Sequence, residues 1–127
     1  MVLTFSTTFS NDFREVKEIL LKKDEQKKIL VKYDNKEKLF KFRWTLYKNG
    51  GLVIFRSYDK IVAQNVLYLR HKNQSFRVEL KTRGTGLFNV PYLFVKFNKF
   101  DRETHTAEFE LLLSDRKEQI ELEELKQ

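Results

Sequence analysis

The sequence predicts an all-β fold of roughly eight short antiparallel strands, arranged as a barrel or a sandwich. Residue types that favour sheets (Val, Ile, Thr, Phe, Tyr and Trp) account for 40 of the 127 positions, whereas alanine, the best helix former, occurs twice. Apolar and polar residues alternate in short runs separated by turn-forming clusters. We predict a single closed antiparallel barrel with meander topology, because closure leaves no aromatic-rich edge exposed.

The length of 127 residues is enough for one hydrophobic core, so we expect one domain over residues 1–127. The longest apolar runs, such as Leu52–Phe55, have four residues, whereas a membrane-spanning helix needs about 20. Residues 1–10 lack the basic start and apolar stretch of a secretory signal, and the chain has no cysteine. We therefore expect a cytoplasmic protein without a membrane span.

Four of the expected strands each have one apolar face. Between the apolar runs lie polar turn clusters, and the pair Asn49 and Gly50 suits a two-residue hairpin because both positions tolerate positive φ. The alternating apolar positions are Phe40, Phe42, Trp44 and Leu46; Phe76, Val78 and Leu80; Leu93, Val95 and Phe97; and Ala107, Phe109, Leu111 and Leu113.

Two segments are less clearly patterned. Between Asn11 and Lys23, apolar residues at helical spacing and a possible capping box indicate a helix, but the same residues also fit a strand followed by a turn and a second strand at Ile29–Tyr33. Residues 117–125 fit either a last strand or a helix. We predict a strand that ends near residue 123.

The order of these features resembles the YwiB-like family, small proteins of Gram-positive bacteria with a calycin-like (lipocalin-like) β-barrel and no established function. The similar features are the strand ending in Leu30–Asp34, the strand Phe40–Leu46 with its glycine turn, and the apolar strand that ends in Arg56 and Ser57. The resemblance implies a strand rather than a helix at 14–21, and a barrel that encloses a small ligand.

The charge is unevenly distributed along the chain. The net charge is +7 and the sequence pI is about 9.6. Residues 101–127 contain nine acidic and four basic residues, a net charge of −5, which leaves +12 on residues 1–100. A basic surface attracts phosphate backbones or acidic proteins, although lysine-rich surfaces often serve solubility alone.

The sequence contains no catalytic constellation. Without cysteine, thiol chemistry and cysteine-bound zinc are excluded, and the two histidines, His71 and His105, lie 34 residues apart in expected turns. The segment 83–86 (Arg-Gly-Thr-Gly) lacks the spacing of a phosphate-binding loop and is better explained as a bulge or turn. We therefore predict a protein that is not an enzyme and uses no cofactor or metal.

The first functional hypothesis is a small apolar or amphipathic ligand inside the barrel. A barrel of about eight strands has room either for its own side chains or for one ligand, so a solid core is the alternative. If Arg56 is buried, it needs an acidic partner such as Asp59 or Glu79. The candidate ligand-binding residues are Phe40, Phe42, Trp44, Leu46, Phe76, Val78, Leu80, Val95, Phe97, Phe109 and Leu111.

The second hypothesis is binding of single-stranded nucleic acid or another polyanion on an outer face of the sheet. Cations interleaved with outward Tyr47 and Tyr68 would combine charge with stacking surfaces. A third hypothesis is a protein interaction module that uses the acidic C-terminal segment. The candidate polyanion-binding residues are Lys38, Lys41, Arg43, Arg77, Lys81 and Arg83.

Overall fold

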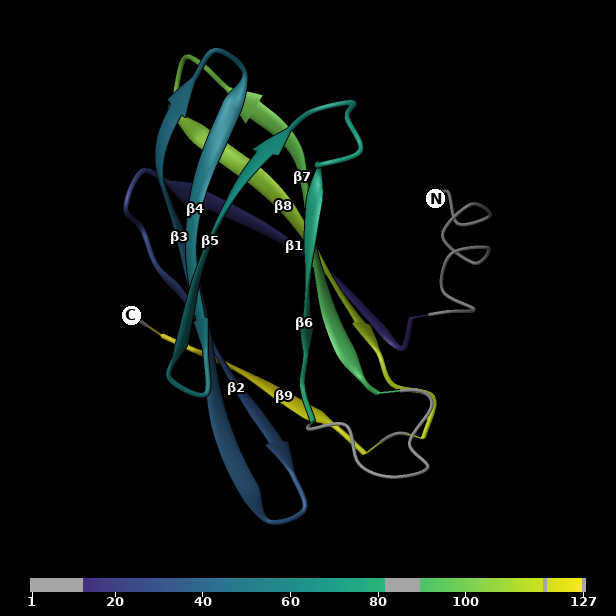
Figure 1. Cartoon of the computed structure of the whole chain (residues 1–127). Helices are drawn as coiled ribbons and strands as arrows, with labels where there is room; N and C mark the ends of the chain where they lie inside the picture. The colour runs from purple at the N-terminus through teal and green to yellow at the C-terminus, as the bar shows by residue number, and fades with distance from the viewer. Residues whose placement is uncertain (1–12, 82–89, 118, 127) are drawn as a thin grey trace.

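The computed structural model describes residues 13–81, 90–117 and 119–126, which form nine antiparallel strands in two sheets (Figure 1). The four-stranded sheet has the order β1-β8-β7-β6, and the five-stranded sheet has the order β5-β4-β3-β2-β9. The all-β antiparallel prediction is confirmed. The strands are β1 (Glu15–Lys22), β2 (Lys27–Tyr33), β3 (Lys36–Lys48), β4 (Gly51–Tyr58), β5 (Ile61–Tyr68), β6 (Ser75–Glu79), β7 (Tyr92–Asp101), β8 (Thr106–Ser114) and β9 (Glu121–Leu125).

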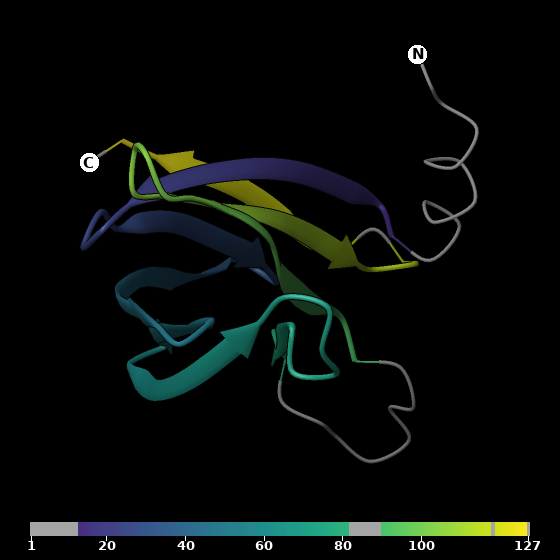
Figure 2. The ribbon, with the colours of Figure 1, turned by 90° about the horizontal axis from the view of Figure 1, so that it is seen from above.

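The strands surround a common interior, but the described residues do not form the closed barrel that the sequence predicted (Figure 2). Consecutive strands pair from β2 to β5 and from β6 to β8, and β1 pairs with β8, as in a meander. Pairing stops between β5 and β6, where the chain passes from one sheet to the other. It also stops between β1 and β2, because β9 occupies the edge of β2 through residues 121–125.

The segment with the helical pattern is strand β1, so the helical interpretation is wrong and the strand implied by the resemblance is confirmed. All eight residues of β1 pair with β8 from Glu15 to Lys22. Ile19 and Leu21 are buried, whereas Leu20 on the opposite face is 58% exposed. Pairing along β8 supplies backbone hydrogen bonds and buries one side of the segment, which outweighs its local helical spacing.

The remaining boundaries follow the sequence pattern closely. The C-terminal strand exists, as predicted, and runs to Leu125 rather than ending near residue 123. At the β3–β4 hairpin Asn49 and Gly50 both have positive φ, 54° and 81°, which confirms the predicted two-residue turn. In the part of the chain that the structure describes, no helix has the length and apolar character needed to cross a membrane.

Aromatic rings occupy the space between the two sheets. Phe42 contacts Phe40, Phe76 and Phe109 with ring centroids 5.2 to 6.2 Å apart, and Phe97 lies 5.9 Å from Phe109. All five rings are at most 5% exposed. Contacts at these distances are typical of a packed aromatic core.

Candidate ligand-binding pocket

Two β-bulges at the same end of the molecule redirect the side chains of β3 and β7. The register of β3 on β4 shifts between Trp44 and Leu46, and that of β7 on β8 shifts between Phe97 and Lys99. A bulge inserts one residue and reverses the faces that follow it. Regular alternation would point Leu46 inward and Tyr47 outward, but Leu46 is 47% exposed and Tyr47 packs against the core.

The sequence predicted that Leu46 points inward and that Tyr47 points outward. Both predictions are wrong because of the bulge in β3. The second bulge acts in the same way, since Phe100 lies opposite the buried Ala107 and packs against the core. A bulge leaves little trace in the sequence: Trp44 to Lys48 contains no glycine, and only the adjacent Leu46 and Tyr47 interrupt the alternation. The two redirected rings meet at the end of the sheets.

The rings of Tyr47 and Phe100 stack with their centroids 3.9 Å apart and their planes at 17°. Trp44 contacts Phe100 edge-on at 5.4 Å, and its indole Nε1–H donates a hydrogen bond to the Leu21 carbonyl oxygen at 2.8 Å. This aromatic group forms the apolar wall of an open pocket of about 480 Å³. The pocket is lined by Lys23, Trp44, Leu46, Tyr47, Phe100, Arg102 and His105.

The polar lining residues come from the two turns above this wall. Lys23 lies in the turn between β1 and β2, and Arg102 and His105 lie in the turn between β7 and β8. The Arg102 guanidinium carbon is 5.9 Å from the centroid of the Tyr47 ring, within the range of a cation–π contact. The lining thus contains one lysine, one arginine and no Asp or Glu.

The carboxylate at the end of β7, that of Asp101, serves the backbone of the β7–β8 turn. Asp101 accepts hydrogen bonds from the N–H groups of Glu103 at 2.9 Å and Thr104 at 3.4 Å. These two bonds hold the pKa of Asp101 below its usual value. The carboxylate therefore fixes the turn that carries Arg102 and His105 at the pocket.

Most of the residues predicted to line the interior do point inward. Leu46 is the exception, and ten of the eleven are at most 5% exposed. They contact one another as a core, and Trp44 alone among these ten also lines the pocket. The buried ten are Phe40, Phe42, Trp44, Phe76, Val78, Leu80, Val95, Phe97, Phe109 and Leu111.

The predicted polyanion-binding residues are spread over both sheets. Lys41 and Arg43 lie on β3 of the five-stranded sheet, and Arg77 lies on β6 of the other, 3.7 Å from Glu79. Lys38 forms an ion pair with Asp59 at 3.0 Å, and hydrogen bonds with Tyr33 and Asp59 raise its pKa.

Lys81 likewise pairs with a carboxylate, 3.2 Å from Asp34, and donates a hydrogen bond to Gln119. Arg83 and the rest of the 83–86 segment lie outside the described residues. The described cations of this set do not share one face, and several are neutralised by acids.

Arg56 is half-buried on the inward side of β4, but its partner differs from the expected carboxylate. Its Nε–H donates to the Asn65 side-chain oxygen at 2.7 Å, and the guanidinium carbon is 4.6 Å from the Phe76 ring centroid. Burial lowers its pKa, without an opposing contribution from a carboxylate. The predicted pairing with Asp59 or Glu79 is therefore replaced by an amide and a ring.

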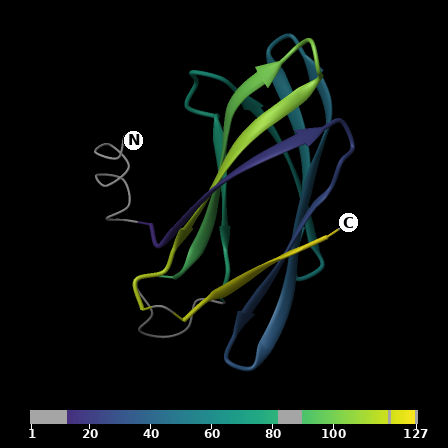
Figure 3. The same ribbon diagram turned by 180° about the vertical axis from the view of Figure 1, so that it is seen from behind.

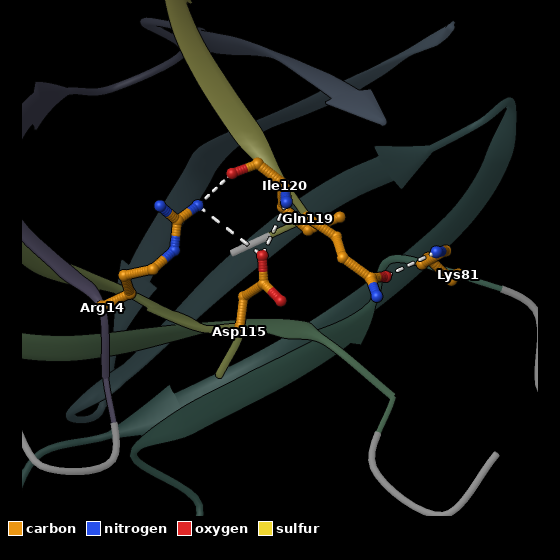
Figure 4. A network of polar contacts seen from close by, with 5 residues as sticks. All are labelled: Arg14, Lys81, Asp115, Gln119 and Ile120. Carbon is orange, nitrogen blue, oxygen red and sulfur yellow. Dashed lines mark hydrogen bonds and ion pairs between the residues drawn. The ribbon is translucent and has the colours of Figure 1, made fainter. Parts of the chain in front are cut away.

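A second polar cluster, which the sequence did not indicate, joins the start of the described chain to the β8–β9 connection (Figure 4). Asp115 is 5% exposed and accepts a hydrogen bond from the Ile120 N–H at 2.6 Å. Arg14 lies 3.6 Å from Asp115 and donates to the Ile120 carbonyl oxygen. The cluster fixes the path by which the chain changes sheets, so we interpret it as structural.

Within residues 13–81, 90–117 and 119–126, no group of three or more His, Cys, Asp or Glu residues is placed to hold a metal ion. Comparison of the chain with known protein families, curated proteins and solved structures gives no match. The resemblance to the YwiB-like family therefore stays a prediction. The pocket must be interpreted from its own chemistry.

Proposed function

We propose that this protein is a non-catalytic binding protein for a small amphipathic anion, held in the pocket of Trp44, Tyr47 and Phe100. The observation that carries the proposal is the combination of a stacked aromatic wall with a cationic rim that contains no acid. Small-molecule sites are typically concave, largely apolar and equipped with a few polar groups that orient the ligand. We further propose that the two sheets are an opened form of the calycin-like arrangement, since β1 still pairs with β8.

The chemistry of the lining indicates the class of ligand. A planar apolar group can lie against the aromatic rings, where stacking and edge contacts are favourable. An acidic group at the other end would face Lys23 and Arg102, and arginine binds carboxylate, sulfonate or phosphate oxygens through paired donors. A neutral ligand of the same shape would keep the contacts with the rings and lose the ionic contacts with Lys23 and Arg102.

This pocket is favoured over the other hypothesised sites by its surroundings. A ligand between the sheets would have to displace packed rings such as Phe42 and Phe109, whose centroids are 5.2 Å apart. A polyanion would meet Lys38 and Lys81 already paired with carboxylates. Binding in the pocket requires neither the displacement of core rings nor the breaking of these ion pairs.

The single tryptophan gives a direct test, since Trp44 lines the pocket and no other residue contributes tryptophan fluorescence. Naphthalene-2-sulfonate and the neutral naphthalene-2-methanol form a matched pair of probes. We expect the sulfonate to quench Trp44 and to bind about tenfold more tightly than the alcohol, a difference of about 1.4 kcal/mol that one charge-assisted contact can supply.

Variants separate the two halves of the pocket. Arg102→Ala should weaken the sulfonate and leave the alcohol unchanged, whereas Phe100→Ala should weaken both probes. Lys72→Ala, at an exposed position in the β5–β6 turn, is the matched control for loss of a cation. Equal binding of the sulfonate to wild type and Arg102→Ala, with Trp44 still quenched, would contradict the proposed role of the rim.

A further inference from the structure

Strand β5 forms an exposed edge of the five-stranded sheet. It pairs with β4 along its whole length without a register shift, and β6 belongs to the other sheet. The two strands meet at the turn that joins them and diverge away from it (Figure 1). Ile61 and Val62, at the divergent end, are 74% and 71% exposed.

The backbone groups available on this edge can be identified from one hydrogen bond. The Tyr68 N–H donates to the Asn73 carbonyl oxygen at 3.0 Å, away from β4. In a strand, N–H and C=O of one residue point to the same side, and the side alternates along the chain. Val62, Gln64 and Val66 therefore direct their N–H and C=O groups away from β4.

The composition of β5 differs from that of every other edge strand in the described sheets. Its sequence, Ile-Val-Ala-Gln-Asn-Val-Leu-Tyr, contains no charge and no proline. The edge strands β1, β6 and β9 all carry charged residues. Proteins commonly protect edges from pairing with charges, prolines or bulges, and β5 has none of these.

The surroundings of β5 are cationic. Lys60 and Arg70 flank the strand at its two ends, and both are exposed. Arg56 lies on β4 directly opposite Ala63, with an amide rather than a carboxylate as its hydrogen-bond partner. The nearby Asp59 is paired with Lys38 at 3.0 Å.

We propose that the free edge of β5 binds an extended acidic peptide segment of another protein as an additional strand. Backbone groups of Val62, Gln64 and Val66 would pair with the segment, and acidic side chains would lie near Arg56, Lys60 and Arg70. The cationic surroundings select such a partner over a second copy of this chain, which would bring the same cations to the same edge. This site shares no residue with the pocket of Trp44 and is independent of the proposed function.

The test uses three blocked peptides with the sequences Glu-Val-Thr-Val-Thr-Val-Glu, Gln-Val-Thr-Val-Thr-Val-Gln and Lys-Val-Thr-Val-Thr-Val-Lys. Affinity is measured by fluorescence anisotropy, and amide hydrogen exchange by NMR. We expect the acidic peptide to bind most tightly, with affinity falling as salt rises, and to slow exchange at Val62, Gln64 and Val66.

Two variants with matched controls locate the binding. Gln64→Pro removes an N–H that does not serve β4, so it should weaken the acidic peptide at least about tenfold relative to Gln64→Thr. Val62→Glu, at a largely exposed position, adds a charge of the same sign as the peptide's, so it should weaken the acidic peptide relative to Val62→Gln, and it guards against misfolding of the proline variant. Arg56→Gln should reduce the preference for the acidic peptide over the neutral one.

The proposal is overturned if Gln64→Pro and Val62→Glu bind the acidic peptide as well as their controls do. Equal affinity for the three peptides would overturn the choice of an acidic partner. Analytical ultracentrifugation of the protein without peptide measures its oligomeric state. A wild-type dimer that Gln64→Pro dissociates would identify a second copy as the occupant and would also overturn the proposal.

Discussion

The two seams between the sheets are held by different chemistry. At the β1–β9 seam, the edge strands of the two sheets lie on the same side of the molecule (Figure 3). Glu124 of β9 pairs with Lys17 of β1 at 2.5 Å and also with Lys27 of β2. Within the five-stranded sheet, Lys32 of β2 pairs with Glu123 of β9 at 2.6 Å. Both edges of this seam are therefore charged and joined to each other.

At the β5–β6 seam the links between described residues are one hydrogen bond between neutral groups and one cation–π contact. The Tyr58 hydroxyl donates to the Leu80 carbonyl oxygen at 2.6 Å, and the Arg56 guanidinium lies over the Phe76 ring. Beyond these links β5 remains uncharged and largely exposed. The difference shows that one seam is closed by side chains of both edges, whereas at the other the backbone edge of β5 has no further strand paired to it among the described residues.

The largest expected effect follows from breaking the buried cluster at the β8–β9 connection. Asp115→Ala should lower the free energy of unfolding by about 3 kcal/mol, because Arg14 and the Ile120 N–H lose a buried partner. Asp115→Asn should cost less, since its amide oxygen can still accept from Ile120. Urea unfolding followed by Trp44 fluorescence measures the free energy of unfolding of both variants. An equal loss of stability in the two variants would show that only the charge of Asp115 matters.

A smaller loss is expected at the β5–β6 seam. Tyr58→Phe removes the hydroxyl that joins β4 to Leu80 and should cost about 1 kcal/mol, the usual net value of a hydrogen bond. Burial raises the pKa of the Tyr58 hydroxyl, so it stays protonated as a donor. Tyr68→Phe, at a 39% exposed ring, is the control. Identical unfolding curves for wild type and Tyr58→Phe would show that this link does not stabilise the seam.

The ion pairs of the β1–β9 seam should give a smaller effect that depends on pH. Hydrogen bonds from Lys17 and then Lys27 lower the pKa of Glu124 below the ordinary value of 4.5. A carboxyl with a lowered folded-state pKa stabilises the fold above its unfolded pKa, and this stabilisation is lost as pH falls through the folded pKa.

Glu124→Gln should therefore cost a few tenths of a kcal/mol at pH 7, because the pair is partly exposed. The cost should disappear at acidic pH, where wild type and variant unfold alike. Glu103→Gln, in the exposed β7–β8 turn, is the control in the same denaturant titrations. A cost that stays constant down to pH 2 would contradict the assignment to the ion pairs.

The smallest effect is expected on the open edge itself. Val62→Thr should change the free energy of unfolding by less than about 0.5 kcal/mol, because the side chain is 71% exposed and Thr retains β-branching. Thermal unfolding measures this change. A loss above about 1 kcal/mol would mean that β5 is packed more tightly than its exposure indicates.

Much of the fold could be predicted because alternation and turn chemistry act locally. Phe40, Phe42 and Trp44 are buried on β3 as their spacing predicts, and Asn49 and Gly50 form the predicted hairpin. Segment 15–22 was ambiguous, since apolar residues at helical spacing can also form a strand when a neighbouring edge accepts it.

The candidate pocket was only partly predictable. Trp44 and Leu46 belonged to the predicted binding residues, but Tyr47 and Phe100 reach the pocket through bulges in β3 and β7. Arg102 and His105 follow in a turn whose direction depends on the hydrogen bonds of Asp101. A bulge adds one residue without any fixed residue type, so the pattern alone could not place these side chains.

The sequence by itself determined the class of fold, most of the strands and the aromatic composition of the core, because these depend on local preference and on burial of alternate residues. Only the tertiary structure decided which edges pair. It placed β9 beside β2, which leaves two sheets instead of the predicted closed barrel, and among the described strands it left β5 paired with β4 alone. Edge pairing depends on contacts between residues far apart in the chain, such as Lys17 and Glu124, and local patterns do not encode them.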